Sequence, residues 1–148
     1  MNEQSNTGGA VNAGYHRERG EYKKDSYKPV KNDFQLYEKA KELSKYTMQI
    51  AARKRMKAWR FTFCNRMIDT TLDILKCIGI ANSLEVHSPR REKLQSEAIK
   101  LCDFFNTMAE LLCQANAINE HTLGVWTKKC CDVKYMCMAW HKRENQKK

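Results

Sequence analysis

A regular spacing of apolar residues between positions 94 and 115 constrains the fold more than any other feature. Apolar side chains recur there at alternating intervals of four and three, at Leu94, Ala98, Leu101, Phe105, Met108, Leu112 and Ala115. An α-helix has 3.6 residues per turn, so this spacing places all seven on one helical face. Ser88 is suited to cap such a helix, Pro89 to occupy its first position, and Glu92 to face the positive end of its dipole. The pattern predicts an amphipathic helix over residues 89–115.

Three further segments show helical periodicity. A helix is expected at about 33–51, capped by Asn32 or Asp33, with a stripe at Leu36, Ala40, Leu43, Thr47 and Ile50. Another is expected at 56–82, where one apolar row comprises Phe63, Met67, Ile74 and Ile78, and a second comprises Phe61, Cys64, Ile68, Leu72 and Leu75. The last is expected at 120–143, capped by Asn119, with a stripe at Leu123, Trp126, Cys130, Val133, Cys137 and Trp140.

These helices account for most of the chain, and short loops join them. The sequence contains only 6 glycines and 2 prolines, too few for the frequent turns of a many-stranded fold. Helices joined by short loops pack antiparallel. The predicted fold is therefore all-α, an antiparallel up-down-up-down four-helix bundle over residues 32–148.

Residues 1–31 are expected to form a flexible polar tail. Glycines alternate there with Asn, Ser, Lys and Glu, and no apolar period is present. Such a segment buries too little apolar surface to offset its ordering entropy.

No apolar run approaches the roughly 18 residues that cross a bilayer, and the first 14 residues lack the apolar core of a secretion signal. We therefore expect a cytoplasmic protein without membrane association.

The seven cysteines are expected to be free thiols. Their number is odd and most lie among apolar residues at helical spacing, where cysteine packs as a small hydrophobe. Metal or redox sensing by Cys130, Cys131, Cys137 and His141 remains an alternative. However, Cys130 and Cys137 are about 10 Å apart along a helix that rises 1.5 Å per residue. The chain is predicted to hold no metal.

Catalytic patterns are sparse. The histidines (His16, His87, His121 and His141) fall in the tail, in a loop or near helix ends, and no Ser/His/Asp arrangement or phosphate-binding glycine loop accompanies them. The sequence therefore predicts neither an enzyme nor a cofactor.

The charge favours polyanionic partners. Lys and Arg number 27 against 17 Asp and Glu, a formal net charge of +10.

The bundle topology gathers these cations at its two ends. At one end lie Arg53, Lys54, Arg55, Lys57 and Arg60, with no acid among them; at the other lie Arg90, Arg91, Lys142 and Arg143. Both groups are candidate phosphate contacts with RNA or DNA, although the first can also be read as a solvated helix start. Trp59 either stacks on a base or turns into the core.

The apolar faces are wider than a bundle helix needs. Extra apolar residues lie beside the main stripes: the second row of the 56–82 helix, and Cys131, Tyr135, Met136 and Met138 in the 120–143 helix. They form either part of a generously packed core or a surface that binds another copy of the chain or a partner protein.

From Asn32 to Lys142, about three-quarters of its length, the chain resembles a known bacterial family. The matching residues are Asn32-Asp33-Phe34, Tyr37-Glu38-Lys39-Ala40, Arg60-Phe61-Thr62, Asp73-Ile74-Leu75, Ala81-Asn82, Arg90-Arg91, Glu97-Ala98, Trp126-Thr127-Lys128, Asp132-Val133-Lys134-Tyr135-Met136 and Ala139-Trp140. The family comprises four-helix-bundle proteins related to Avd, the accessory variability determinant of diversity-generating retroelements. A second branch is encoded within intervening sequences of 23S ribosomal RNA genes.

The resemblance implies a basic, ring-like homo-oligomer, pentameric in the best-known case. Such an assembly associates with a reverse transcriptase and its template RNA and supports mutagenic complementary-DNA synthesis. The expected function is therefore that of a non-catalytic nucleic-acid-binding accessory protein. The alternative is a helical protein-interaction scaffold whose charge only aids solubility.

Overall fold

The computed structural model describes residues 34–146. Within this range the helices are α2 (Gln35–Ala51), α3 (Asn65–Ser83), α4 (Pro89–Gln114) and α5 (Glu120–Asn145). The expected tail over residues 1–31 and the candidate caps Asn32 and Asp33 lie outside the described residues.

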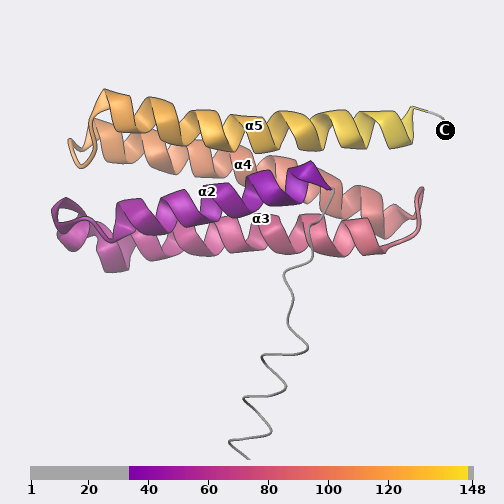
Figure 1. Cartoon of the computed structure of the whole chain (residues 1–148), viewed down its shortest axis with the longest axis horizontal. Coiled ribbons are helices and arrows are strands. Elements are labelled where there is room, and N and C mark those ends of the chain that lie inside the picture. The colour runs from indigo at the N-terminus through magenta and orange to yellow at the C-terminus, as the bar shows by residue number, and fades with distance from the viewer. Residues whose placement is uncertain (1–33, 147–148) are drawn as a thin grey trace, which may run out of the picture. The chain divides into compact units, whose positions relative to one another are not determined.

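The four helices form an antiparallel bundle, which confirms the predicted fold class (Figure 1). Successive helices pack side by side, α2 on α3, α3 on α4 and α4 on α5, and α5 closes the ring against α2. One end of the bundle holds the α2–α3 connection and the α4–α5 loop, and the opposite end holds the α3–α4 loop and the end of α5. None of the helices among residues 34–146 combines the length and the apolarity that crossing a membrane requires.

Most of the predicted apolar stripes form the core. The whole α2 stripe is buried, as are Ala98, Phe105 and Leu112 of α4. Every member of the α5 stripe is buried except Leu123, which is partly exposed. The Phe105 and Trp126 rings meet edge to face, with centroids 5.5 Å apart.

Side-chain caps begin the last two helices as predicted. The Ser88 hydroxyl accepts a hydrogen bond from the Arg91 backbone N–H over 3.2 Å, and Pro89 is the first residue of α4. The Asn119 side chain accepts from the Thr122 N–H over 2.8 Å at the start of α5. Both bonds satisfy N–H groups that have no partner within the helix.

The prediction of a regular helix from position 56 is wrong at its start. Before α3 the chain forms a 3₁₀ segment (Lys54–Trp59) and then a π segment (Arg60–Cys64). A π turn inserts one residue relative to an α-helix and so shifts the phase of the residues before it by about 100°. The second predicted row is only partly buried: Cys64 is buried, Ile68 and Leu75 are partly buried, and Phe61, inside the π segment, and Leu72, in regular α3, are exposed.

Candidate nucleic-acid interface

The first group of predicted site residues lies together in the α2–α3 connection. We call Arg53, Lys54, Arg55, Lys57 and Arg60 the cationic tip. Its first four members are exposed, whereas Arg60 is partly buried. They sit at the bundle end that also holds the α4–α5 loop.

Arg60 binds the backbone at the end of α2. Its Nε donates to the Ala51 carbonyl over 3.1 Å, and one terminal nitrogen donates to the Arg53 carbonyl over 3.4 Å. The last carbonyls of a helix lack partners and carry the negative end of the dipole, so a guanidinium there stabilises the helix end. Arg60 therefore shapes the tip, and only its remaining N–H groups are open to a ligand.

Arg53 ties the tip to the neighbouring helix. Its Nη1 donates to the Thr122 hydroxyl in the first turn of α5 over 3.4 Å. The side chain stays exposed around this contact. The hydrogen bond limits how the connection moves relative to α5 and leaves the charge of Arg53 facing solvent.

Within residues 34–146, no carboxylate pairs with the cationic tip. The sequence between Glu42 and Asp69 contains neither Asp nor Glu, and within residues 34–146 none of the five cations forms an ion pair. Cations elsewhere do pair, as Lys39 does with Glu42 at 3.7 Å. The tip therefore presents uncompensated positive charge.

The aromatic residue exposed at the tip is Phe61, not Trp59. The ring of Trp59 is partly buried and contacts Phe63 edge to face at a centroid distance of 6.4 Å. Phe61 is 84% exposed. Periodicity assigned Phe61 to an apolar row, and its exposure was not predicted; Trp59 was the aromatic residue considered for stacking.

The Cys64 thiol beneath the tip is not poised as a nucleophile. Burial raises its pKa, and the nearby Arg60 charge opposes this only in part. A raised pKa keeps the thiol protonated at neutral pH, so Cys64 acts as a packing group.

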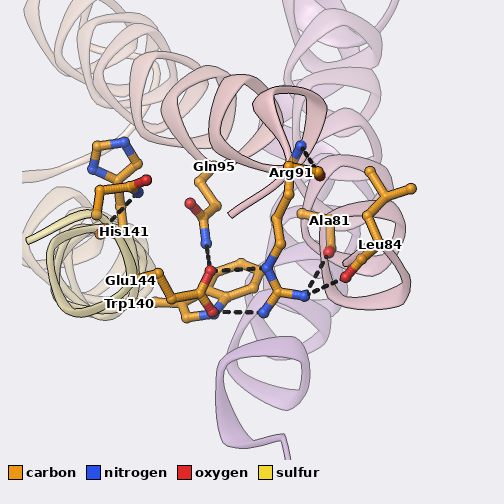
Figure 2. A network of polar contacts seen from close by, with 9 residues as sticks. Ala81, Leu84, Arg91, Gln95, Trp140, His141 and Glu144 are labelled. Atoms are coloured by element: carbon orange, nitrogen blue, oxygen red, sulfur yellow. Dashed lines mark hydrogen bonds and ion pairs between the residues drawn. The ribbon is translucent and has the colours of Figure 1, made fainter. Parts of the chain in front are cut away.

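At the opposite end Arg90, Lys142 and Arg143 are exposed, but Arg91 is not. Arg91 is 7% exposed, and its guanidinium binds both Glu144 carboxylate oxygens, Nε at 2.8 Å and Nη2 at 2.6 Å (Figure 2). Its Nη1 donates to the carbonyls of Ala81, at 3.1 Å, and Leu84, at 2.7 Å. Because every guanidinium nitrogen is engaged, we withdraw Arg91 from the candidate phosphate contacts.

Glu144 is the centre of this buried network. Besides Arg91, it accepts from Gln95 Nε2 over 2.9 Å and from Trp140 Nε1 over 2.7 Å (Figure 2). The hydrogen bonds from Arg91 hold the pKa of the Glu144 carboxyl below its usual value, although burial acts in the opposite direction. The network joins the α3–α4 loop, the first turns of α4 and the last turns of α5.

Three of the cysteines of α4 and α5 pack in the bundle core. Cys102, Cys130 and Cys137 are buried, and the Cys130 thiol donates to the Cys102 carbonyl over 3.4 Å. A hydrogen bond with Cys102 and burial raise the pKa of Cys130, and burial raises that of Cys137. In the part of the chain that the structure describes, no three His, Cys, Asp or Glu side chains are grouped to hold a metal ion.

Comparison with known proteins identifies no relative: no family model, curated protein or solved structure matches the chain.

Proposed function

We propose that this protein is a non-catalytic, nucleic-acid-binding accessory protein of a diversity-generating retroelement. In this role it binds template RNA together with a reverse transcriptase and supports mutagenic complementary-DNA synthesis as a homo-oligomer. The retroelement, the polymerase and the oligomer rest on the family resemblance of residues 32–142. The nucleic-acid binding also rests on the residues themselves.

The observation that carries the binding activity is the unpaired charge of the cationic tip. Arg53, Lys54, Arg55 and Lys57 are exposed and free of carboxylate partners in the described chain. Cations in this state release condensed counterions from a nucleic acid, so affinity falls as salt rises. If copies assemble symmetrically, each modest patch is repeated and the contacts add through multivalency.

The test is the triple change Arg53→Ala, Lys54→Ala and Arg55→Ala, with RNA affinity measured over a salt series. Each phosphate contact to a single strand contributes about 0.7 to the slope of log affinity against log salt, so the slope should flatten by up to about 2. Affinity should fall while helicity by circular dichroism is unchanged, because these side chains are exposed.

A matched control removes three other exposed cations, Lys39, Lys41 and Lys128. Each of these lies within 4 Å of a carboxylate, Glu42, Glu38 and Asp132 respectively. The control lowers net charge equally but should change the salt slope less. If the tip variant binds RNA like the unchanged protein at every salt concentration, the tip has no part in binding.

The retroelement assignment has separate tests. The neighbouring genes should include a reverse transcriptase and a repeat-bearing variable gene, and the polymerase should co-purify with this protein. A ribosomal RNA gene around the reading frame would indicate the other branch of the family instead. Light scattering on the purified protein should show an assembly larger than one chain.

One observation favours the scaffold alternative. An open groove between α2 and α3 is lined by Met48, Ala52 and Leu75, and Leu72 of α3 is also exposed. An exposed apolar surface of this kind marks a protein contact. Capture of a partner protein that survives nuclease and high salt, together with no measurable RNA affinity, would support the scaffold.

A further inference from the structure

Phe61 is the most exposed large apolar side chain in the described part of the chain. It is 84% exposed, against 61% for Tyr135 and 54% for Met48. Within residues 34–146 its ring meets no other aromatic ring and no cation. Leaving a whole phenyl ring in water forfeits the free energy that burial would provide.

The backbone directs this ring outward. In an uninterrupted α-helix, Phe61 would lie seven residues before Ile68 on nearly the same face, toward the partly buried α2–α3 groove. Phe61 instead lies inside the π segment Arg60–Cys64, whose wider turn rotates the ring away from that α-helical phase. Single π turns of this kind often occur at functional sites. The segment therefore presents Phe61 to solvent.

The ring stands in a strongly cationic setting. Phe61 directly follows Arg60 and comes four residues after Lys57, and the acid-free stretch of sequence extends to Asp69. Arg60 is held against the α2 carboxyl end by two hydrogen bonds, which fixes the base of the segment that carries the ring. An exposed aromatic ring on the same short segment as unpaired cations can combine a stacking surface with phosphate contacts.

We infer that Phe61 stacks on an unpaired base, so that the cationic tip selects single-stranded over double-stranded nucleic acid. This inference rests on the proposed nucleic-acid binding and deepens it. Cations alone bind the phosphates of either form. A stacking ring contributes only where a base face is accessible, and in a duplex the base faces are covered by neighbouring pairs.

The experiment compares Phe61→Ala and Phe61→Tyr with the unchanged protein by fluorescence anisotropy. The probes are a single-stranded oligoribonucleotide and a duplex of the same sequence. Phe61→Ala should weaken single-strand binding about 5- to 150-fold, which corresponds to about 1–3 kcal/mol of stacking per base. Phe61→Tyr keeps an aromatic face and should bind within a few-fold of the unchanged protein. Duplex affinity should not change in either variant.

The salt slope separates this inference from the proposed function. Phe61→Ala removes no cation, so its slope should equal that of the unchanged protein, whereas the Arg53/Lys54/Arg55 variant should have a flatter slope. Phe104→Ala is the matched control, because Phe104 is 50% exposed on α4 and lies outside the tip. It should leave both affinities unchanged.

Two outcomes would overturn the inference. The first is Phe61→Ala binding both probes as the unchanged protein does, and the second is an equal loss for single strand and duplex. In either case a loss in the Arg53/Lys54/Arg55 variant would still support nucleic-acid binding. A third result would also overturn the inference: Phe61→Ala keeps its RNA affinity, but the reverse transcriptase no longer co-purifies with it. The ring would then be assigned to a protein contact.

Discussion

Arg91 shows how neighbouring residues of one type acquire different roles. Arg90 and Arg91 are adjacent in sequence, yet one faces solvent and the other is buried over the Trp140 ring, with its guanidinium carbon 5.2 Å from the ring centroid. A buried guanidinium is tolerated only when hydrogen bonds and an opposite charge compensate its lost hydration. Glu144 and the carbonyls of Ala81 and Leu84 supply that compensation.

Glu144→Gln should destabilise the protein substantially. The change leaves Arg91 buried without a counter-charge, and breaking such a pair costs about 3 kcal/mol. The urea midpoint at pH 7 should fall with an unchanged m-value. Glu110→Gln is the control, because Glu110 is exposed on α4 and forms no ion pair within residues 34–146. If both variants unfold at the same urea concentration, the network contributes nothing to stability.

The same carboxyl predicts how stability depends on acid. The pKa of Glu144 is lowered in the folded protein from 4.5, chiefly by hydrogen bonds from Arg91. A lowered folded pKa adds stability above the unfolded value, and that contribution is lost as pH falls through the folded value. Below about pH 4.5 the unchanged protein should therefore lose stability more steeply than Glu144→Gln does. Parallel urea curves for the two proteins across this range would contradict the prediction.

At the scale of elements, α2 is joined to α5 by a buried hydrogen bond. Trp126 Nε1 donates over 2.9 Å to the hydroxyl of Thr47, which donates in turn over 2.8 Å to the Leu43 carbonyl. Both side chains are almost completely buried. Thr47 lies on the predicted apolar stripe, so its polar role arises from the packing partner on another helix.

Thr47→Val should lower the free energy of unfolding. Valine keeps the shape and nearly the same helix propensity but leaves the Trp126 N–H buried without an acceptor, which costs about 1–3 kcal/mol. Equilibrium urea unfolding, followed by circular dichroism, measures the loss. Thr107→Val provides the comparison, because the Thr107 hydroxyl is exposed and, among residues 34–146, bonds only to the Asp103 carbonyl of its own helix. Equal effects of the two changes would rule out the interhelical bond as the cause.

Features that depend on nearby residues were predictable from the sequence. Ser88, Pro89 and Asn119 act through groups within three positions of themselves, and apolar spacing reports the buried face of each regular helix. The outward turn of Phe61 was not predictable, because the π segment breaks the phase without any marker residue such as Gly or Pro. The burial of Arg91 was not predictable either, since its partner Glu144 lies 53 positions away and meets it only in the folded bundle.

At the scale of the molecule, exposed cations collect at both ends of the bundle. Arg53, Lys54, Arg55 and Lys57 lie beside the α4–α5 loop, whereas Arg90, Lys142 and Arg143 lie beside the α3–α4 loop and the end of α5 (Figure 1). The 26 residues of α4 separate these ends. At 1.5 Å per residue the separation is about 39 Å, several times the Debye length of about 8 Å at physiological salt.

Two groups so far apart should act independently on a long nucleic acid. Combining Arg90→Ala, Lys142→Ala and Arg143→Ala with the triple change at the tip should add the two losses of binding free energy to within about 0.5 kcal/mol.

An oligonucleotide of about six nucleotides is too short to reach both ends, and Phe61 and the tip should hold it alone. Anisotropy titrations with both RNA lengths measure this. The short RNA should then respond mainly to the tip variant, because in the described chain no Phe, Tyr or Trp ring is exposed beside Arg90, Lys142 and Arg143. If the short RNA loses equal affinity in both triple variants, the two ends bind equivalently and the stacking residue does not determine where a single strand docks.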